Sequence, residues 1–514
     1  MPKSEDSENT RLRKENARLQ KSLDRMEKQL QEANDANKEL RALMKDLQEK
    51  LDILIVQFKK RNRKDFGNKT ERHNPRPALA DELSPPTAKE KSTPKPRNHI
   101  KHILSQNLPP EIVPHTVKPE DATCPYCIVD TVFVGTEVTH QLERLTQTLK
   151  HLQHEQEVRA CPKCRKYIVT AEKPCSPIPG SYAGPGLLAD VCVNKLADGL
   201  PNYRQEKRYK RESATIPRST QSDWMLAASF TVEPLYDLVT RRLLLSRVIQ
   251  TDDSELKVQD RKHKRKMRKG KMTVYRGDEN HRFVAFDFSP DQTFARNVAF
   301  LEQFVGIVQA DAAKGFDKLY EDGTKVEAGC NAHSRRKYYE ALVIDPQSCN
   351  PILDIYHELY DIEAEIKTRS PAEKLAERRA RSKPLVGQLH ALVLSLGEKL
   401  NPKHPVMRAV LYTLTHWQAL TRFLEDPAIN IDNNAAEREI KDFVIDRKNF
   451  LFAGSDAGGK SIAILLTLIA SAKRNKIDPR AYLTDVFTRI NSMKTSELEQ
   501  LLPDRWTPNQ NKVS

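Results

Sequence analysis

The hydrophobic residues of the first 66 positions follow a seven-residue repeat. Apolar residues recur every seven positions from Leu12 to Leu54, and a second series, four residues later, runs from Asn16 to Phe58. Charged and polar residues fill nearly all the other positions, which is typical of a coiled coil. One helix cannot bury this seam alone, so we expect a homodimer or higher oligomer, although a helix packed on its own protein is an alternative. Asn in the seam favours parallel pairing.

The periodic pattern ends in a basic and then an irregular segment. Residues 59–64 are mostly Lys and Arg, and they either lie on DNA phosphates or form a solvated helix end. Residues 67–100 are rich in Pro, Lys and Ser and have no apolar period. Such a composition predicts a disordered linker.

Two Cys-x-x-Cys pairs mark the next segment, residues 101–180. They are Cys124 with Cys127 and Cys161 with Cys164. Paired thiolates at this spacing bind one structural Zn²⁺, although four ordinary thiols are the alternative. The 33 residues between the pairs exceed the usual ~15–20, and their pattern does not separate strand from helix. We expect a zinc-finger module that stabilises the fold and performs no chemistry.

Helical patterns dominate residues 181–245. One helix is expected over residues 189–211, and after a short break Ser219 is expected to cap a second helix. This outline is that of a DNA-binding helix-turn-helix, although any two-helix corner has the same pattern. The candidate groove contacts are Arg218, Thr220, Gln221 and Asp223.

Short apolar runs that end in acids follow from residue 246 onward. One strand is expected to end at Asp252 and Asp253, and another at Asp311. Strands and helices alternate here, so the pattern predicts an α/β core with carboxylates converging at one edge of a sheet. The predicted parts are residues 246–346 as the first part of the core, 347–428 as an all-helical insertion, 429–480 as the last part of the core and 481–514 as a helical tail.

A third acid is expected near the start of a helix in the last part of the core. Asp432 or Asn433 would cap this helix, and its second turn would present Glu437 beside Arg438. Three converging carboxylates would bind two divalent metal ions, which prefer oxygen ligands. Solvated or capping roles for the acids are the alternative. The fold class predicted is therefore multidomain α+β, with a coiled coil, a zinc module, a helical region and an α/β core.

Composition narrows the class of protein. The 514 residues include 85 Lys and Arg against 70 Asp and Glu, a formal net charge of +15. No apolar run approaches the ~18 residues of a membrane span, and the first residues lack a secretory signal. Eight cysteines are too few for a disulfide scaffold. We expect a cytoplasmic protein with a polyanionic partner.

The order of these segments resembles the insertion-sequence 66 family of bacterial DDE transposases along nearly the whole chain. The stretches that carry the resemblance include GPGLLADVCVNKLADGLPNYRQEKRY, VQADAAKGFDKLY, GCNAHSRRKYYEAL, IDNNAAERE, DRKNFLFAGSDAGG and LLPDRW. The resemblance implies an RNase H-like catalytic core, an N-terminal zipper and a zinc-finger module. It also implies a nucleoid-associated bacterial protein and companion proteins encoded by the same element.

The resemblance also assigns roles to residues. Asp252, Asp311 and Glu437 match the family's three metal-binding acids, which would hold two Mg²⁺ (or Mn²⁺) ions, although Asp253 is an adjacent candidate for the first. These ions would support hydrolysis and then transesterification of double-stranded DNA, at the element's terminal repeats and at the target. From the basic pattern itself, the residues expected to contact phosphates are His333, Arg335, Arg336, Lys337, Arg438, Arg447 and Lys448, although a core hydrogen bond is the alternative role of His333.

Two other functions fit parts of the pattern. One is a dimeric zinc-containing transcription factor that binds DNA through the helix-turn-helix without catalysis. The other is a coiled-coil scaffold with an inert C-terminal half. Both leave the acid-bearing α/β segment unexplained.

Overall fold

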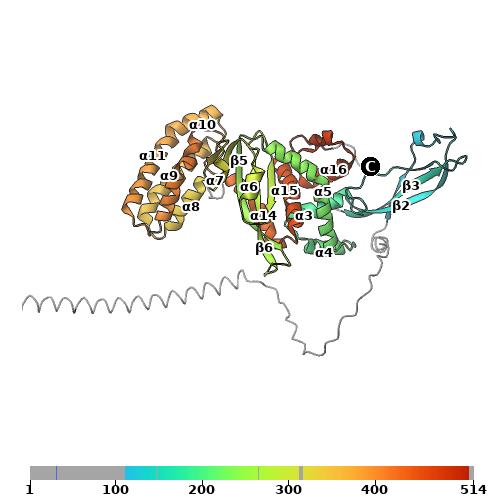
Figure 1. The fold of residues 1–514 in the computed structure, drawn as a ribbon, viewed down its shortest axis with the longest axis horizontal. Coiled ribbons are helices and arrows are strands. Elements are labelled where there is room, and N and C mark those ends of the chain that lie inside the picture. Colours follow the sequence, from blue (N-terminus) through green and yellow to red (C-terminus); the bar gives the residue numbers. More distant parts are fainter. Residues whose placement is uncertain (1–30, 32–109, 146–147, 264, 312–316, 509–514) are drawn as a thin grey trace, which may run out of the picture. The chain divides into compact units, whose positions relative to one another are not determined.

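The structure is a computed structural model, and the predicted coiled coil and linker lie almost wholly outside the residues that it describes. The described residues are 31, 110–145, 148–263, 265–311 and 317–508. They contain helices and two sheets of mixed strand direction, in agreement with the predicted α+β class (Figure 1). Among them, no helix is both long and apolar enough to cross a membrane.

The segment that carries the two cysteine pairs is built on a long antiparallel hairpin. Strand β2 pairs with β3 from Val132 opposite Ala160 to Leu145 opposite Thr148, so the stretch that the sequence left ambiguous is strand. Strand β1 adds to β3 in parallel, and β4 pairs with the far end of β3. The bounds are β1 (Pro110–His115), β2 (Val132–Leu145), β3 (Thr148–Ala160) and β4 (Ile168–Thr170).

Three helices follow, and two of them correct the sequence prediction. The helix expected over residues 189–211 is interrupted, because Gly199 adopts a positive φ of 63° and Pro201 forms the N-cap of the next helix. Ser219 is not a cap, since the third helix already begins at Arg218. The bounds are α3 (Pro185–Leu196), α4 (Asn202–Arg211) and α5 (Arg218–Leu243).

The second sheet has five strands in the order β7-β6-β5-β8-β9. Strands β5, β6 and β7 are antiparallel neighbours, whereas β8 and β9 run parallel to β5. The bounds are β5 (Val248–Gln259), β6 (Met267–Arg276), β7 (Val284–Ser289), β8 (Gly306–Gln309) and β9 (Lys325–Ala328).

Strand β5 is longer than its apolar pattern predicts. It does not end at Asp252 and Asp253, because β6 pairs with it as far as Gln259. Its pairing with β8 stops at Gln250. The two acids therefore lie in the middle of β5, just beyond the parallel part of the sheet.

Helices from the C-terminal third of the described chain cover the sheet. Helix α14 (Asn434–Phe450) packs on β5 and β6, and α15 (Asp456–Arg474) lies along β7 (Figure 1). The hydroxyls of Ser471 and Thr467 accept hydrogen bonds from the amides of Val284 and Phe286, at 3.0 and 2.8 Å. These bonds satisfy edge-strand groups that would otherwise be open to another strand.

The residues predicted as an all-helical insertion form a helical layer with its own core. Buried residues of this layer include Tyr356, Leu389 and Val410, and the layer also packs against Val248 and Ala328 of the five-stranded sheet. The layer also includes α8 (Asn331–Ala341), which precedes the predicted insertion. The other bounds are α9 (Pro346–Glu365), α10 (Pro371–Glu377), α11 (Lys383–Lys399), α12 (Met407–Thr415) and α13 (Trp417–Thr421).

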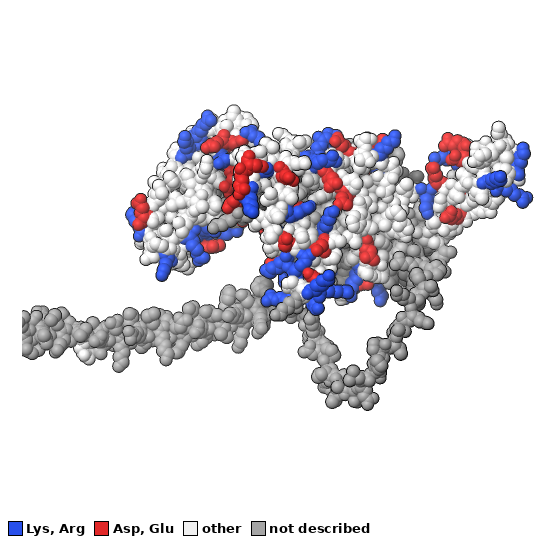
Figure 2. Space-filling view, viewed as in Figure 1, with Lys and Arg blue, Asp and Glu red and all other residues white. Residues whose placement is uncertain are grey.

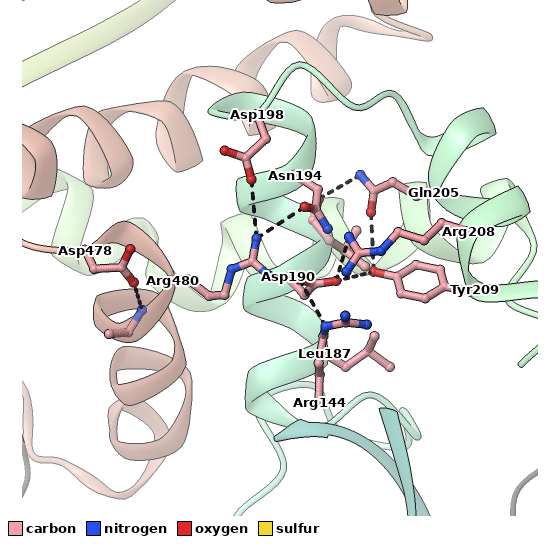
Figure 3. Close-up of polar contacts among 12 residues, drawn as sticks. Arg144, Leu187, Asp190, Asn194, Asp198, Gln205, Arg208, Tyr209, Asp478 and Arg480 are labelled. Carbon is pink, nitrogen blue, oxygen red and sulfur yellow. Dashed lines mark hydrogen bonds and ion pairs between the residues drawn. The ribbon is translucent and has the colours of Figure 1, made fainter. Parts of the chain in front are cut away.

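A buried ionic cluster joins the hairpin to the helical region and to α16 (Pro479–Arg489). Asp190 of α3 is fully buried and lies between three arginines, as Figure 3 shows. Its carboxylate is 3.4 Å from Arg144 Nε and 3.7 Å from Arg208 Nη1, it pairs with Arg480, and it accepts a 2.9 Å hydrogen bond from the Tyr209 hydroxyl. Charge pairing thus links segments far apart in the sequence.

Candidate functional site

Asp252 and Asp311 lie at corresponding places relative to two neighbouring parallel strands: Asp252 lies within β5, and Asp311 lies two residues past the end of β8. Gln250 of β5 is the register partner of Gln309 of β8, and each acid follows two residues later. The side chains of these two glutamines are hydrogen-bonded at 2.8 Å, which holds the strand pair together beneath the acids. The register thus brings the two acids to the same part of the sheet.

Glu437 reaches the same place from the start of α14. The helix begins at Asn434 with Asn433 as the N-cap, so Glu437 lies in the first turn and not in the second. The Asn433 side-chain amide donates a 3.1 Å hydrogen bond to the carbonyl of Thr251, the residue before Asp252. This bond ties the start of α14 to β5. Asp252 and Glu437 line one open pocket of about 350 Å³.

The three carboxylates interact electrostatically. Burial, together with the nearby charges of Glu437 and Asp311, raises the pKa of Asp252 to about 7, against the lowering effect of a hydrogen bond from the Asp253 amide. Like charges disfavour ionisation when they share a site. Asp252 is thus held where its negative charge is costly, which is a common property of functional acids.

Asp253 has a different neighbour. Its Oδ2 lies 3.6 Å from Nζ of Lys271, a side chain that is almost fully buried on β6. The Lys271 ammonium also lies 3.7 Å from the ring centroid of Phe294. Burial lowers the pKa of Lys271. A cation within reach gives Asp253 a structural partner of its own that Asp252 does not share.

The Cys-x-x-His motif of α8 also reaches the acids. His333 Nδ1 lies 3.7 Å from Glu437 Oε1, and Arg336 Nη2 lies 4.0 Å from Glu437 Oε2. Cys330, the N-cap of α8, contributes a buried sulfur to the same group. His333 and Arg336, two of the residues predicted to contact phosphates, thus lie beside Glu437.

The four cysteines of the two Cys-x-x-Cys pairs converge. Their sulfurs all lie within 4.8 Å of one another, and Cys124 Sγ is 3.7 Å from Cys164 Sγ. Backbone amides of Lys166 and Tyr167 lower the pKa of Cys164 to about 6, which favours the thiolate form that binds metal. The chemistry and the spacing fit one tetrahedral zinc ion.

The residues predicted to contact DNA divide by exposure. Gln221 is fully buried, and its side-chain amide donates to the Ile216 carbonyl at 3.0 Å, so the prediction that it reads a DNA groove is wrong. The exposed residues of the predicted set are Arg218, Arg335, Arg336, Arg438 and Lys448, and those partly exposed are Thr220, His333, Lys337 and Arg447.

Sequence reasoning missed a basic face on α4. This helix exposes Arg204, Lys207, Lys210 and Arg211 around the half-exposed ring of Tyr203. Figure 2 shows Lys and Arg side chains gathered where α4 and the β5–β6 hairpin lie. The signal was present in the run NYRQEKRYKR, but the helix-turn-helix interpretation placed the contacts on the following helix.

Comparison with known proteins agrees with this architecture. The profile of the "Transposase IS66 family" matches residues 180–461, and that of the "IS66 C-terminal element" matches residues 467–503. The chain belongs to the IS66 transposase family. The first match spans the five-stranded sheet, the helical layer and α14, and thus all three acids. The second spans the end of α15 and α16.

Three relatives from Sinorhizobium fredii are similar to this IS66 family member over most of its length. Uncharacterized protein y4hP is 30% identical over 73% of this chain and 71% of its own. Uncharacterized protein y4jD is 30% identical over 77% and 80%, and uncharacterized protein y4qI is 32% identical over 67% and 66%. The names of these relatives assign no activity to them.

Proposed function

We propose that the protein is a DDE-type transposase that cuts DNA at the terminal repeats of its element and transfers the cut strand to a target. The observation that carries this proposal is that the charges of Glu437 and Asp311 act on Asp252, and that Asp252 and Glu437 line the same open pocket. A mixed sheet of three antiparallel and two parallel strands, covered by helices, supports the RNase H-like core proposed for it.

The three acids fit a divalent metal site. They offer only oxygen ligands, which Mg²⁺ and Mn²⁺ prefer, and Glu437 Oε1 is buried without a hydrogen-bond partner. Divalent cations would also remove the repulsion that raises the pKa of Asp252. Two such ions supply activation of the attacking oxygen and stabilisation of the leaving 3′ oxygen.

The residues around the acids would position the DNA. Arg336 and Arg438 are exposed beside Glu437, and both can contact phosphates of the strand to be cut. Arg447 and Lys448 line a second surface pocket together with Lys257 of β5. The basic face of α4 would bind DNA phosphates farther from the acids.

Asp252, and not Asp253, is proposed as the first acid. The charges of both Glu437 and Asp311 act on the pKa of Asp252, whereas Asp253 is paired with Lys271 and, of these two acids, only Asp311 acts on its pKa. A carboxylate with its own buried cation partner is less available to a metal.

The four-cysteine cluster is proposed to hold a structural Zn²⁺. Four thiolates leave no open coordination position, so this ion would stabilise the hairpin module and take no part in cleavage. The predicted oligomer would be formed by residues 1–66, which, apart from residue 31, lie outside the described residues.

The proposal is tested by nicking of terminal-repeat DNA in Mg²⁺ or Mn²⁺. Asp252→Asn, Asp311→Asn and Glu437→Gln should each lower the cleavage rate by on the order of 10³-fold or more, because each removes a metal ligand. Asp253→Asn should retain much more activity. Asp361→Asn, at an exposed acid of α9, is the matched control.

The alternative, a DNA-binding protein without catalysis, predicts a different result. In that case the wild type and the three acid variants bind terminal-repeat DNA equally and none of them nicks it. That outcome would refute the enzyme proposal.

A further inference from the structure

We propose that Cys330, His333 and Glu437 form a second metal site, selective for Zn²⁺ over Mg²⁺, and that zinc bound there inhibits strand cleavage by occupying Glu437. The binding of zinc follows from the geometry of these three residues. Its effect on cleavage rests on the function proposed above.

Three different ligand types meet at one point between two helix starts. The sulfur of Cys330, a ring nitrogen of His333 and a carboxylate oxygen of Glu437 all lie within 4.8 Å of one another. The backbone amide of Asn331 and its side-chain amide both donate to the Ile431 carbonyl at 3.1 Å, which fixes the start of α8 against the segment that leads into α14. The ligands are thus held by packed structure and not by a loose loop.

Two of the ligand atoms have unused bonding capacity. His333 Nδ1 and Glu437 Oε1 are buried, lack a hydrogen-bond partner and lie 3.7 Å apart. A tetrahedral zinc ion with bonds of ~2.0–2.2 Å would bring such a pair to about 3.3–3.5 Å, a shift of a few tenths of an ångström. An ion between them would supply a partner to both atoms at once.

Burial raises the pKa of the Cys330 thiol to about 12, so the thiol would lose its proton only on binding a metal ion. The sulfur is fully buried and accepts hydrogen bonds from the backbone amides of Asn433 and His333. Donors of this kind stabilise and orient metal ligands from outside the coordination sphere. When the zinc–sulfur bond forms, the thiol proton is released to solvent.

The ligand set discriminates between metals. Thiolate and imidazole are ligands of zinc, whereas Mg²⁺ takes oxygen ligands almost exclusively. Three protein ligands leave one coordination position open, unlike the closed four-cysteine cluster. Because Glu437 also belongs to the proposed acid site, zinc held by Cys330 and His333 would withdraw that carboxylate from the catalytic metals.

Zinc binding is tested on the full-length protein by equilibrium dialysis against Zn²⁺ followed by metal analysis. The wild type should hold one zinc ion more per chain than Cys330→Ser or His333→Ala. Loss of one ligand should lower the zinc affinity of this site by more than about 100-fold. Even the loss of a hydrogen-bond partner outside the coordination sphere lowers metal affinity by about 10- to 100-fold. Cys349→Ser, at an equally buried thiol of α9, and His357→Ala, at an exposed histidine, should hold as much zinc as the wild type.

Cobalt(II) provides an independent spectroscopic measurement. Substitution at the proposed site should add thiolate-to-cobalt charge-transfer absorbance that disappears in Cys330→Ser and persists in Cys349→Ser. His333→Ala removes a different ligand and keeps the Cys330 thiol. Loss of the metal in both Cys330→Ser and His333→Ala therefore identifies the site, even where one of the two substitutions perturbs folding. Equal zinc content in the wild type and both ligand variants would overturn the proposal.

The effect on cleavage is measured separately in constant Mg²⁺. Added Zn²⁺ should lower the wild-type nicking rate by about tenfold or more and should change the rate of Cys330→Ser less than twofold, as expected from competition for one ligand. Nicking that Zn²⁺ leaves unchanged in the wild type would overturn the inhibitory role. Normal zinc binding in a protein that never nicks DNA would instead refute the function proposed above.

Discussion

Asp252 is an acid whose position lowers the stability of the folded protein. It lies on a central strand beside two other carboxylates, and burial together with these charges raises its pKa to about 7. An acid whose pKa is raised by folding binds its proton more tightly in the folded than in the unfolded state. Stability is therefore lost as the pH rises from the unfolded pKa of ~3.9 through about 7.

Removing this charge should stabilise the metal-free protein at high pH. We expect Asp252→Asn to increase the free energy of unfolding relative to the wild type, by at most about 4 kcal/mol above pH 7, since one pKa unit corresponds to about 1.4 kcal/mol. The gain should shrink as the pH falls toward 4, because the folded wild-type acid is then neutral and the unfolded one is about half protonated. Urea unfolding between pH 4 and pH 8 without added divalent metal measures it.

The control for this prediction is Asp361→Asn, at an exposed acid on α9. Its unfolding free energy should differ little from that of the wild type across the same pH range. A gain at Asp252→Asn that does not vary with pH would show that packing, and not charge, is responsible.

At the scale of single residues, the sequence predicted which side chains are candidate metal ligands better than it predicted their burial and their neighbours. Asp252 and Asp311 were recognisable because each follows a short apolar run that ends in an acid. The prediction that Gln221 contacts DNA was wrong, because the burial of this residue depends on how α5 packs. A polar residue near the start of a helix has the same local sequence pattern whether its side chain faces DNA or a protein core. The pairing of Lys271 with Asp253 could not be predicted from the sequence, because it also depends on how the elements pack.

Elements are linked in this protein by buried charge as well as by apolar packing. Asp190 connects β2, α3, α4 and α16 through three arginines (Figure 3). Removing one partner of a buried ionic cluster leaves uncompensated charge, which is more costly than the loss of an exposed ion pair. We expect Asp190→Ala to lower the free energy of unfolding by about 3 kcal/mol in urea denaturation.

Asp198 provides the matched control for Asp190. It pairs with the same Arg480 at 3.3 Å, but its side chain is 53% exposed. Asp198→Ala should cost no more than about 1 kcal/mol. Equal losses in the two variants would contradict the role assigned to burial.

The cysteine cluster should support one module and not the whole protein. Because a closed thiolate site stabilises the fold that contains it, removing zinc should raise amide hydrogen exchange in β1 to β4 and leave β5 to β9 protected. Exchange measured by mass spectrometry, with and without chelator, tests this. Cys175→Ser is the control, since Cys175 is exposed and lies outside the cluster. Exchange that is unchanged, or that rises equally in both sheets, would contradict the prediction.

Element boundaries show where local patterns are insufficient. Helices α3 and α4 read as one apolar-periodic run, and the Gly199–Pro201 break divides them. Strand β5 extends past its acids because β6 supplies backbone partners for residues that have little apolar character. The long β2–β3 hairpin was ambiguous because pairing with a neighbouring strand, and not local preference, decides strand formation there.

At the scale of the whole molecule, self-association is predicted to reside in residues 1–66. Deleting them should reduce the mass of the protein in sedimentation to that of a monomer, because the heptad seam is buried only between chains. Replacing the seam Asn16 by Leu instead is a milder control that should preserve association and loosen its register. An unchanged mass after the deletion would show that the assembly depends on other surfaces.

The sequence by itself determined the order of the segments, the two cysteine pairs, the family and the three candidate acids, because periodicity, spacing and motifs are local properties of the chain. The tertiary structure decided which of these residues meet. It aligned Asp252 with Asp311 through strand register, brought Glu437 to them from more than 120 residues away along the chain, and buried Gln221 and Asp190. Such contacts join distant parts of the chain. Their energies depend on tertiary packing, which cannot be predicted from the local sequence pattern.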